Sequence, residues 1–217
     1  MRLLLLFILL SSSVFGQDQW KDVYKESAWA DRDRWQRPDE IIKQLNLRPG
    51  SAVADIGCHE GYMTVKLSKA VGENGKVYAE DISQTKLDRL QEHLDERKIS
   101  NVMVVKGEED NPTLPEGTLD AVIILDAYHE MDEHEKILNH ISHALKPAGR
   151  LVLCEAVAES RRGATRENQE GRHELGINFA AGDLNKAGFT ILKQQDPFVD
   201  RTREKGDKMW LLVAVRK

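Results

Sequence analysis

The segment Asp55–Tyr62, DIGCHEGY, has the residue types and the spacing with which a peptide backbone binds a small ligand. It continues a run of small apolar residues that is typical of a buried strand, and Gly57 and Gly61 bracket a tight turn. Glycine lets a ligand approach the backbone amides at the start of a helix, where anionic groups bind. Because His59 stands at the centre of this turn, where such loops usually have a third glycine, we predict a modified ligand-binding loop.

Acidic residues stand where the first two expected strands end. Asp55 ends the first of these strands, and Asp81 ends the second, 24 residues beyond Gly57. In doubly wound sheets a carboxylate at the end of the second strand accepts hydrogen bonds from the hydroxyls of a ribose. Glu80 precedes Asp81, and we expect its side chain to point to the opposite face because side chains alternate along a strand. These residues predict a nucleotide-like ligand at the carboxyl ends of the strands.

An alternation of strands and helices must position these loops. Apolar runs with strand character occur at residues 51–57, 75–82, 101–107, 119–131, 146–156, 190–196 and 207–217. Helical periodicity occurs at residues 38–47, 62–71, 84–97, 134–145 and 174–189. Such a pattern favours a parallel sheet covered on both faces, and the last two runs, joined by a loop alone, are expected to pair antiparallel. The predicted fold is α/β: a doubly wound, mostly parallel seven-stranded Rossmann-like sheet with an antiparallel C-terminal hairpin.

Six short segments occur in an order that carries a family likeness: VADIGCHEGY, VYAEDIS, VVKGEED, LDAVIILDAYHEM, ALKPAGRLVLCEA and LNKAGF. In these segments the chain resembles the class I S-adenosylmethionine-dependent methyltransferases, and the resemblance covers roughly residues 36–217. It implies S-adenosyl-L-methionine as the cofactor and transfer of its methyl group to a small molecule, whose identity and acceptor atom stay open.

The resemblance also assigns residues to the cofactor. It implies that the modified glycine loop and Asp55 face the methionine part and that Asp81 binds the ribose. It also implies that one of Glu108, Glu109 and Asp110 lies near the adenine amine, and of these Glu108 is preferred because it directly follows Gly107. The alternative for each carboxylate is a solvated loop position. His59 can crowd the cofactor or hydrogen-bond its carboxylate. The expected cofactor-binding residues are Asp55, Gly57, His59, Gly61, Asp81, Glu108 and Asp126.

The segment DAYHEM, residues 126–131, is expected to face the methyl group, because ligands of such sheets bind at the carboxyl edge. The candidate catalytic residues are Tyr128, His129 and Glu130. His129 is the preferred general base, since an unperturbed imidazole has a pKa of about 6.5. The alternative is that His129 or Glu130 organises the loop by hydrogen bonds.

The first sixteen residues, MRLLLLFILLSSSVFG, differ from the rest of the chain. Their apolar block is shorter than the ~20 residues that span a bilayer, and we interpret residues 1–16 as a signal peptide cleaved after Gly16. An uncleaved anchor is the alternative. The expected organisation is therefore a signal peptide, an aromatic-containing extension at residues 17–37 and a methyltransferase domain at residues 38–217, exported to the periplasm or the medium without a stable membrane span.

Composition limits the remaining partners. The 217 residues suffice for one sizeable core, and the net charge of −5 with no basic block argues against nucleic acid as a partner. The seven histidines are scattered, so we expect no metal site. Cys58 and Cys154 are expected to be free thiols, because another strand should separate them. Oligomeric state stays open.

Two further features each have two interpretations. Trp29 and Trp35 either belong to a lid over the cofactor, where aromatic faces favour a sulfonium, or attach a helix to the core. The polar segment 156–173 either receives an anionic substrate or is an exposed loop. The residues that would contact such a substrate are Arg161, Arg162, Arg172 and His173.

Two other functions stay open. An exported, non-catalytic binding protein could reuse the fold, since fold does not dictate function. A nicotinamide-dependent oxidoreductase is the third hypothesis, although GCHEG is one residue short of the G-x-G-x-x-G pattern.

Overall fold

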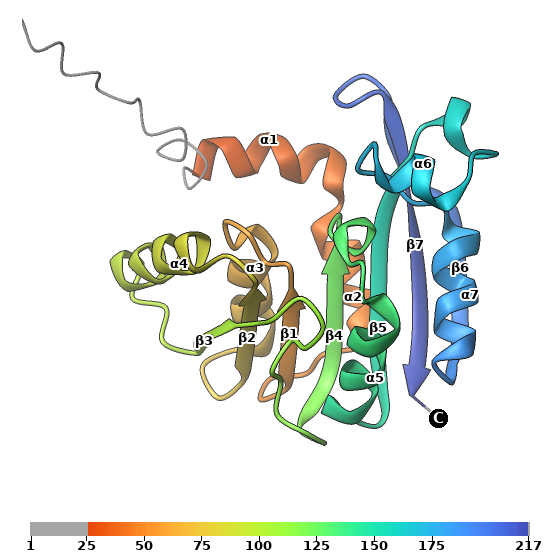
Figure 1. Cartoon of the computed structure of the whole chain (residues 1–217). Helices are drawn as coiled ribbons and strands as arrows, with labels where there is room; N and C mark the ends of the chain where they lie inside the picture. Colours follow the sequence, from red (N-terminus) through yellow and green to blue (C-terminus); the bar gives the residue numbers. More distant parts are fainter. Residues whose placement is uncertain (1–25, 217) are drawn as a thin grey trace, which may run out of the picture.

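One seven-stranded sheet forms the centre of the molecule. The computed structural model describes residues 26–216, and its strands lie in the order β3-β2-β1-β4-β5-β7-β6 (Figure 1). Their bounds are β1 Ala52–Ile56, β2 Lys76–Asp81, β3 Val102–Lys106, β4 Leu119–Leu125, β5 Leu145–Val157, β6 Phe189–Arg201 and β7 Asp207–Arg216. The first five strands pair in parallel, whereas β7 runs antiparallel to both β5 and β6. The predicted fold, including the C-terminal hairpin, is confirmed.

Helices cover both faces of the sheet. Their bounds are α1 Glu26–Gln36, α2 Pro38–Leu45, α3 Tyr62–Val71, α4 Gln84–Glu96, α5 His134–Ala144, α6 Arg166–Glu170 and α7 Ile177–Lys186. One core cluster joins α2, α3 and α4 to the sheet, and a second joins α5 and α7 to it. Consecutive strand residues such as Val53 and Ala54 belong to opposite clusters, as the side-chain alternation of a strand requires. This arrangement leaves the carboxyl ends of the strands free to build a site.

The strand expected at residues 119–131 is shorter than predicted. β4 ends at Leu125, because Asp126 adopts a left-handed conformation with φ of 56° and residues 128–130 form a short 3-10 turn. The buried carboxylate of Glu155 stabilises this turn by accepting the backbone N–H groups of Ala127 at 2.7 Å and Tyr128 at 2.5 Å. The turn changes which side chains of DAYHEM reach the edge of the sheet.

Three expectations concern the rest of the chain. Cys58 and Cys154 are both free and buried, as expected, and β4 separates their strands. None of the helices within residues 26–216 has the length and apolar character needed to cross a membrane. The predicted signal peptide and residues 17–25 of the extension lie outside the described residues, while the end of that extension forms α1.

Candidate active site

A cavity of about 970 Å³ opens at the carboxyl ends of β1, β2 and β4. Helix α1 passes over these strand ends, and its Arg32 and Trp35 contribute to the lining (Figure 1). Ten of the lining residues are acidic and three are Arg or Lys, so the cavity carries a strong excess of negative charge. A concave site of this volume suits a ligand of cofactor size, and its charge favours a cation.

The glycine loop between β1 and α3 contains three residues in the left-handed region. The φ angles are 70° at Gly57, 47° at His59 and 79° at Gly61. Glycine is required at the outer positions, where a Cβ would lie 2.7 Å from the Cβ of Ala127 and 2.4 Å from Cδ1 of Leu90, respectively. At the middle position a histidine is accommodated, although L-residues other than glycine seldom adopt this conformation.

His59 lines the cavity, as predicted, but its ring lies against a neighbouring side chain. The imidazole Nδ1 forms an ion pair with the carboxylate of Glu60, which also accepts a hydrogen bond from Arg32 at 2.7 Å. Arg32 in turn stacks on the ring of Tyr62, with Cζ 3.9 Å from the ring centroid. The loop is therefore connected to α1 through charged side chains.

The backbone amides of the loop donate to neighbouring residues of the protein itself. The N–H of Cys58 donates to the carbonyl of Glu80 at 2.9 Å, and that of Gly61 donates to the carbonyl of Cys58 at 2.8 Å. The N–H of His59 donates to Oδ2 of Asp81 at 3.1 Å. These donors consequently do not form an open cradle for a phosphate.

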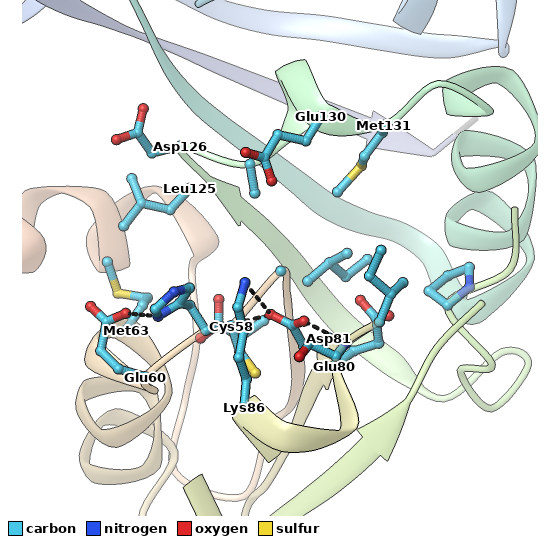
Figure 2. Close-up of a pocket in the computed structure, with 18 of the residues that line it drawn as sticks. Cys58, Glu60, Met63, Glu80, Asp81, Lys86, Leu125, Asp126, Glu130 and Met131 are labelled. Carbon is cyan, nitrogen blue, oxygen red and sulfur yellow. Dashed lines mark hydrogen bonds and ion pairs between the residues drawn. The ribbon is translucent and has the colours of Figure 1, made fainter. Parts of the chain in front are cut away.

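Asp81 lies at the end of β2 with a buried carboxylate that borders the cavity. Besides the bond to His59, its Oδ1 accepts the N–H of Ser83 at 2.8 Å, and Lys86 lies 3.9 Å from Oδ2 (Figure 2). Two backbone donors and a lysine thus hold this carboxylate in one orientation at the cavity wall. The position is the one expected for a ribose-binding acid.

Two further carboxyl groups are buried beside Asp81. Asp55 accepts a hydrogen bond from the hydroxyl of Thr64 at 2.6 Å, and burial raises its pKa to about 7. Burial, with the nearby charges of Asp81 and Asp55, raises the pKa of Glu80 to about 8. Glu80, which we expect on the opposite face of the strand from Asp81, lines the cavity together with Asp81 (Figure 2). A Cβ on Gly107 would lie 1.8 Å from Oε1 of Glu80, so the glycine makes room for this carboxyl.

Glu108 and Asp126 both line the cavity, in different surroundings. Glu108 is exposed, and its backbone pairs with that of Asn111. Asp126 instead accepts a hydrogen bond from Arg201 at 2.9 Å. Burial alone would raise the pKa of Asp126, but the Arg201 guanidinium holds it below its usual value. Arg201 lies at the end of β6 and gave no signal in the sequence, because only the folded chain brings this residue to the turn that follows β4.

One of the three candidate catalytic residues lines the cavity. Glu130 lines the cavity, whereas Tyr128 and His129 are not among its lining residues. Tyr128 is fully buried and its hydroxyl donates to Asp183 at 3.1 Å, so its prediction as a residue facing the methyl group is wrong. His129 is also buried, with Nδ1 2.7 Å from Glu155, which supports the alternative that it organises the loop.

The aromatic residues of α1 divide between the two interpretations. Trp29 is buried and packs edge-to-face on Tyr62 and His93, so it attaches α1 to α3 and α4. Trp35 lines the cavity and lies under the guanidinium of Arg201, at 5.8 Å. Only Trp35 of this pair is placed to contact a ligand.

The segment 156–173 is more ordered than an exposed loop, since it includes α6 and a short 3-10 helix. Its two neighbouring arginines are already paired: Arg161 binds Glu174, and Arg162 contacts Asp196 at 2.8 Å. These pairs do not favour the interpretation in which the two arginines receive an anionic substrate. His173 is exposed and lies 3.2 Å from Glu130.

Comparisons with known proteins agree with this geometry. Residues 53–149 match the family model described as a methyltransferase domain. A solved S-adenosylmethionine-dependent methyltransferase from Aquifex aeolicus superposes with a TM-score of 0.71 at 25% identity, over 89% of this chain and 99% of that chain. Sequence and fold together support the class I S-adenosylmethionine-dependent methyltransferase superfamily.

Curated relatives match this chain over only part of their length. Demethylmenaquinone methyltransferase of Geobacillus sp. is 28% identical over 117 residues, covering 54% of this chain and 50% of the relative. The ubiquinone/menaquinone biosynthesis C-methyltransferase UbiE of Escherichia fergusonii is 34% identical over 110 residues, covering 50% of this chain and 44% of the relative. The chain thus spans about half the length of the curated relatives it matches.

The site of this methyltransferase-superfamily chain fits the cofactor of the group. S-adenosylmethionine combines a sulfonium and an ammonium with one carboxylate, so it carries a net positive charge that suits an acidic cavity. Asp81 offers an oriented carboxylate for hydroxyl groups, and Asp55 and Glu80 are buried acids that a cation would stabilise in their ionised form. The residues present therefore fit the cofactor in charge and in hydrogen-bonding capacity.

Proposed function

We propose that the protein is an S-adenosylmethionine-dependent methyltransferase that acts on a neutral or cationic small molecule. The observation that carries this proposal is the acidic cavity at the carboxyl ends of β1, β2 and β4, with ten acidic and three basic lining residues. A cavity of this charge attracts a cationic cofactor and repels an acceptor that carries phosphate or carboxylate groups.

Each part of the cavity has a role in this proposal. Asp81 binds the ribose hydroxyls, Asp55 and Glu80 balance the cationic methionine part, and the turn from Gly57 to Gly61 provides a surface without bulky side chains. When bound, S-adenosylmethionine supplies an electrophilic methyl group that a nucleophile takes by in-line displacement. Trp35 of α1 excludes water from one side of the cavity and offers an aromatic face to a cation.

A nicotinamide dinucleotide suits this site less well. Its pyrophosphate would need free backbone amides in the glycine loop before α3, but those of Cys58, His59 and Gly61 donate to acceptors within the protein. The pyrophosphate would also meet an excess of negative charge. Both observations favour an adenosyl cation over a dinucleotide.

The acceptor side combines an apolar surface with one acid. Leu125, Met131 and Ile137 contribute apolar lining, and Glu130 is placed to accept a proton from an acceptor group. An acceptor with an uncharged, partly apolar body suits this lining. The names of the curated relatives, which refer to menaquinone and ubiquinone biosynthesis, describe acceptors of that chemical type.

Thermal unfolding in the presence of ligands tests the cofactor part of the proposal. A ligand at a hundred times its dissociation constant stabilises the folded state by about 2.7 kcal/mol, which raises Tm of a chain of this size by roughly 5–10 °C. We expect this shift with S-adenosylmethionine and S-adenosylhomocysteine and none with NAD. Release of S-adenosylhomocysteine in the presence of a demethylmenaquinone analogue then tests the acceptor class. A shift with NAD alone would reject the proposal, and no shift with any ligand would favour the binding-protein alternative.

We also propose that the chain is exported, because its first sixteen residues have the composition of a signal peptide. N-terminal sequencing of protein recovered outside the cytoplasm should begin at Gln17. Recovery of the full-length chain in the membrane fraction would instead support the uncleaved anchor.

A further inference from the structure

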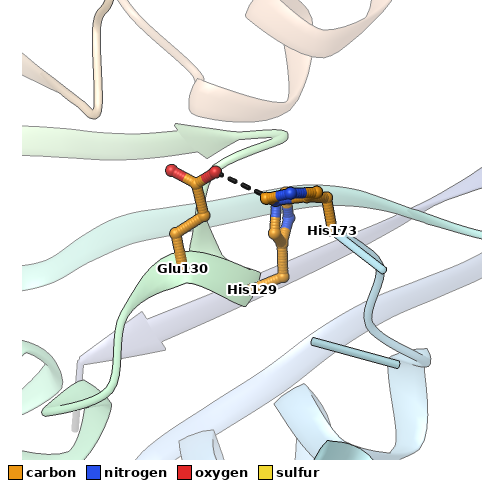
Figure 3. A group of neighbouring side chains, drawn as sticks. All are labelled: His129, Glu130 and His173. Carbon is orange, nitrogen blue, oxygen red and sulfur yellow. Dashed lines mark ion pairs between the residues drawn. The ribbon is translucent and has the colours of Figure 1, made fainter. Parts of the chain in front are cut away.

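Two histidines and a glutamate converge at the edge of the cavity. Oε1 of Glu130 lies 3.8 Å from Nε2 of His129 and 3.2 Å from Nδ1 of His173 (Figure 3). One potential ligand atom from each of the three residues lies within 4.8 Å of the other two. His129 and Glu130 belong to the turn after β4, whereas His173 follows α6, so residues distant in the sequence are brought together here.

The ring of His129 is fixed by a buried acid. Glu155 is fully buried on β5, and its Oε1 accepts the N–H groups of Ala127 and Tyr128. Its Oε2 lies 2.7 Å from Nδ1 of His129. In the neutral ring of His129, a carboxylate in this position holds the proton on Nδ1 and leaves the lone pair on Nε2, which is the arrangement that orients a metal-binding histidine.

This orientation leaves electron-pair donors facing one another. The Nε2 lone pair of His129 and the nearby ring nitrogen of His173 both lie beside the same carboxylate oxygen of Glu130. A cation between such groups converts their repulsion into attraction. Zinc-class ions bind imidazole nitrogen and carboxylate oxygen at about 2.0–2.2 Å, so two ligands of a tetrahedral ion lie about 3.3 Å apart. The observed separations of 3.2 and 3.8 Å are close to that spacing.

We propose that His129, Glu130 and His173 bind a divalent transition-metal ion of the zinc class, oriented by Glu155 behind His129. The set Asp126, His129 and Glu155 also lies within ligand distance. It is less suited, because Arg201 already binds Asp126 and two backbone amides occupy Oε1 of Glu155. Three protein ligands leave at least one coordination position for water or another ligand. Because Glu130 also lines the cavity, this position adjoins the proposed methyl-transfer site. From the sequence we expect no metal site, and the proposal for His129, Glu130 and His173 departs from that expectation.

Binding of Co²⁺ and Zn²⁺ to the metal-free protein tests the proposal without cofactor or acceptor. Protein purified without a polyhistidine tag is titrated with Co²⁺ at mildly alkaline pH, because metal ligands bind in their deprotonated form, and the visible ligand-field absorption is followed. We expect saturable one-to-one binding, and displacement of the Co²⁺ signal by Zn²⁺. His173 and Glu130 are exposed, so His173→Ala and Glu130→Gln should fold normally and weaken binding at least about tenfold. His143→Ala and Glu167→Gln replace exposed residues elsewhere and should bind as the unaltered protein does.

The buried acid provides a separate readout. Glu155→Gln should weaken Co²⁺ binding by about 10–100-fold with the stoichiometry unchanged, because the ring of His129 loses its orienting partner. The proposal would be overturned if the unaltered protein showed no saturable binding, or if His173→Ala and Glu130→Gln bound Co²⁺ as tightly as the unaltered protein. The three side chains would then be held together by a shared proton instead of a metal ion. The cofactor part of the methyltransferase proposal is unaffected by either result, since its own test is the thermal shift with adenosyl ligands.

Discussion

The carboxylate of Asp81 accepts a hydrogen bond from the backbone N–H of His59 at 3.1 Å. This bond ties the acid at the end of β2 to the unusual residue of the glycine loop after β1. The loop therefore does not depend on a third glycine for its shape, because β2 holds it through Asp81 and through the carbonyl of Glu80. One carboxylate shapes the loop and also faces the cavity.

Replacement of Asp81 should affect cofactor affinity most strongly. A hydrogen bond to a charged group contributes about 1.5–3 kcal/mol, so Asp81→Ala, which removes the acceptor for two ribose hydroxyls, should weaken S-adenosylhomocysteine binding by about 100-fold or more. Isothermal titration calorimetry measures this directly. Asp88→Ala on the exposed side of α4 is the matched control and should leave the affinity unchanged. Equal affinity in the Asp81 and Asp88 variants would remove Asp81 from the cofactor site.

The conformation of His59 predicts how the loop responds to substitution. With φ of 47°, His59→Gly should keep the fold and the cofactor affinity, because glycine adopts this region without steric cost. His59→Val should be less stable than His59→Gly by about 1–2 kcal/mol, since a β-branched residue is strained there. Urea unfolding of the two variants gives the difference. If valine proved as stable as glycine, the left-handed conformation at this position would be wrong.

Much of the fold follows from local sequence signals. The apolar runs ending at Asp55 and Asp81, and the helical periodicity between them, place β1, α3 and β2 within a few residues of the predicted bounds. The handedness of crossovers and the loop between the last two strands then determine a mostly parallel sheet with an antiparallel end. These signals suffice because each depends on residues that are close together in the chain.

The parts of the site that the sequence does not predict depend on contacts between residues that are distant in the chain. Arg201 binds Asp126 across 75 positions, and His173 approaches Glu130 only after α6 has folded against the turn that follows β4. Periodicity carries no information about such pairs. Tyr128 was misplaced for another reason: the left-handed residue Asp126 ends β4 early, so strand alternation no longer determines where the following side chains point.

The raised pKa of Asp55 predicts a pH-dependent stability. The carboxyl releases its proton near 3.8 in the unfolded chain and near 7 in the folded protein, where burial disfavours the charge. Between these values the folded state binds more protons, so the contribution of Asp55 to the free energy of unfolding falls as pH rises, by up to about 1.4 kcal/mol per pH unit. Asp55→Asn cannot ionise and should escape this loss.

The measurement is the difference in free energy of unfolding between the unaltered protein and Asp55→Asn across that pH range. The difference should move in favour of the variant as pH rises from about 4 to about 7. Asp95→Asn, at an exposed position of α4, serves as the control and should show no such trend. A constant difference would mean that Asp55 is ionised throughout.

Among the charged residues near the site, replacement of Arg201 should lower the free energy of unfolding most. Its guanidinium is almost fully buried and joins Asp126 on one side to Asp207 on the other. Arg201→Met leaves these carboxylates without a partner and should lower the free energy of unfolding by about 3 kcal/mol, within the range for a broken buried ion pair. Arg203→Met, in the exposed turn that follows, should change it by less than about 0.5 kcal/mol.

The pH dependence of this loss identifies its cause. Arg201 holds the pKa of Asp126 below its usual value, so the stabilisation is present at neutral pH and is lost as pH falls through the folded-state pKa. The gap in urea-unfolding free energy between the unaltered protein and Arg201→Met should therefore narrow in acid. The triple variant Arg201→Met/Asp126→Asn/Asp207→Asn, which removes the unpaired charges, should recover part of the loss at neutral pH. If the gap were constant and the triple variant recovered nothing, lost packing rather than charge would explain the effect.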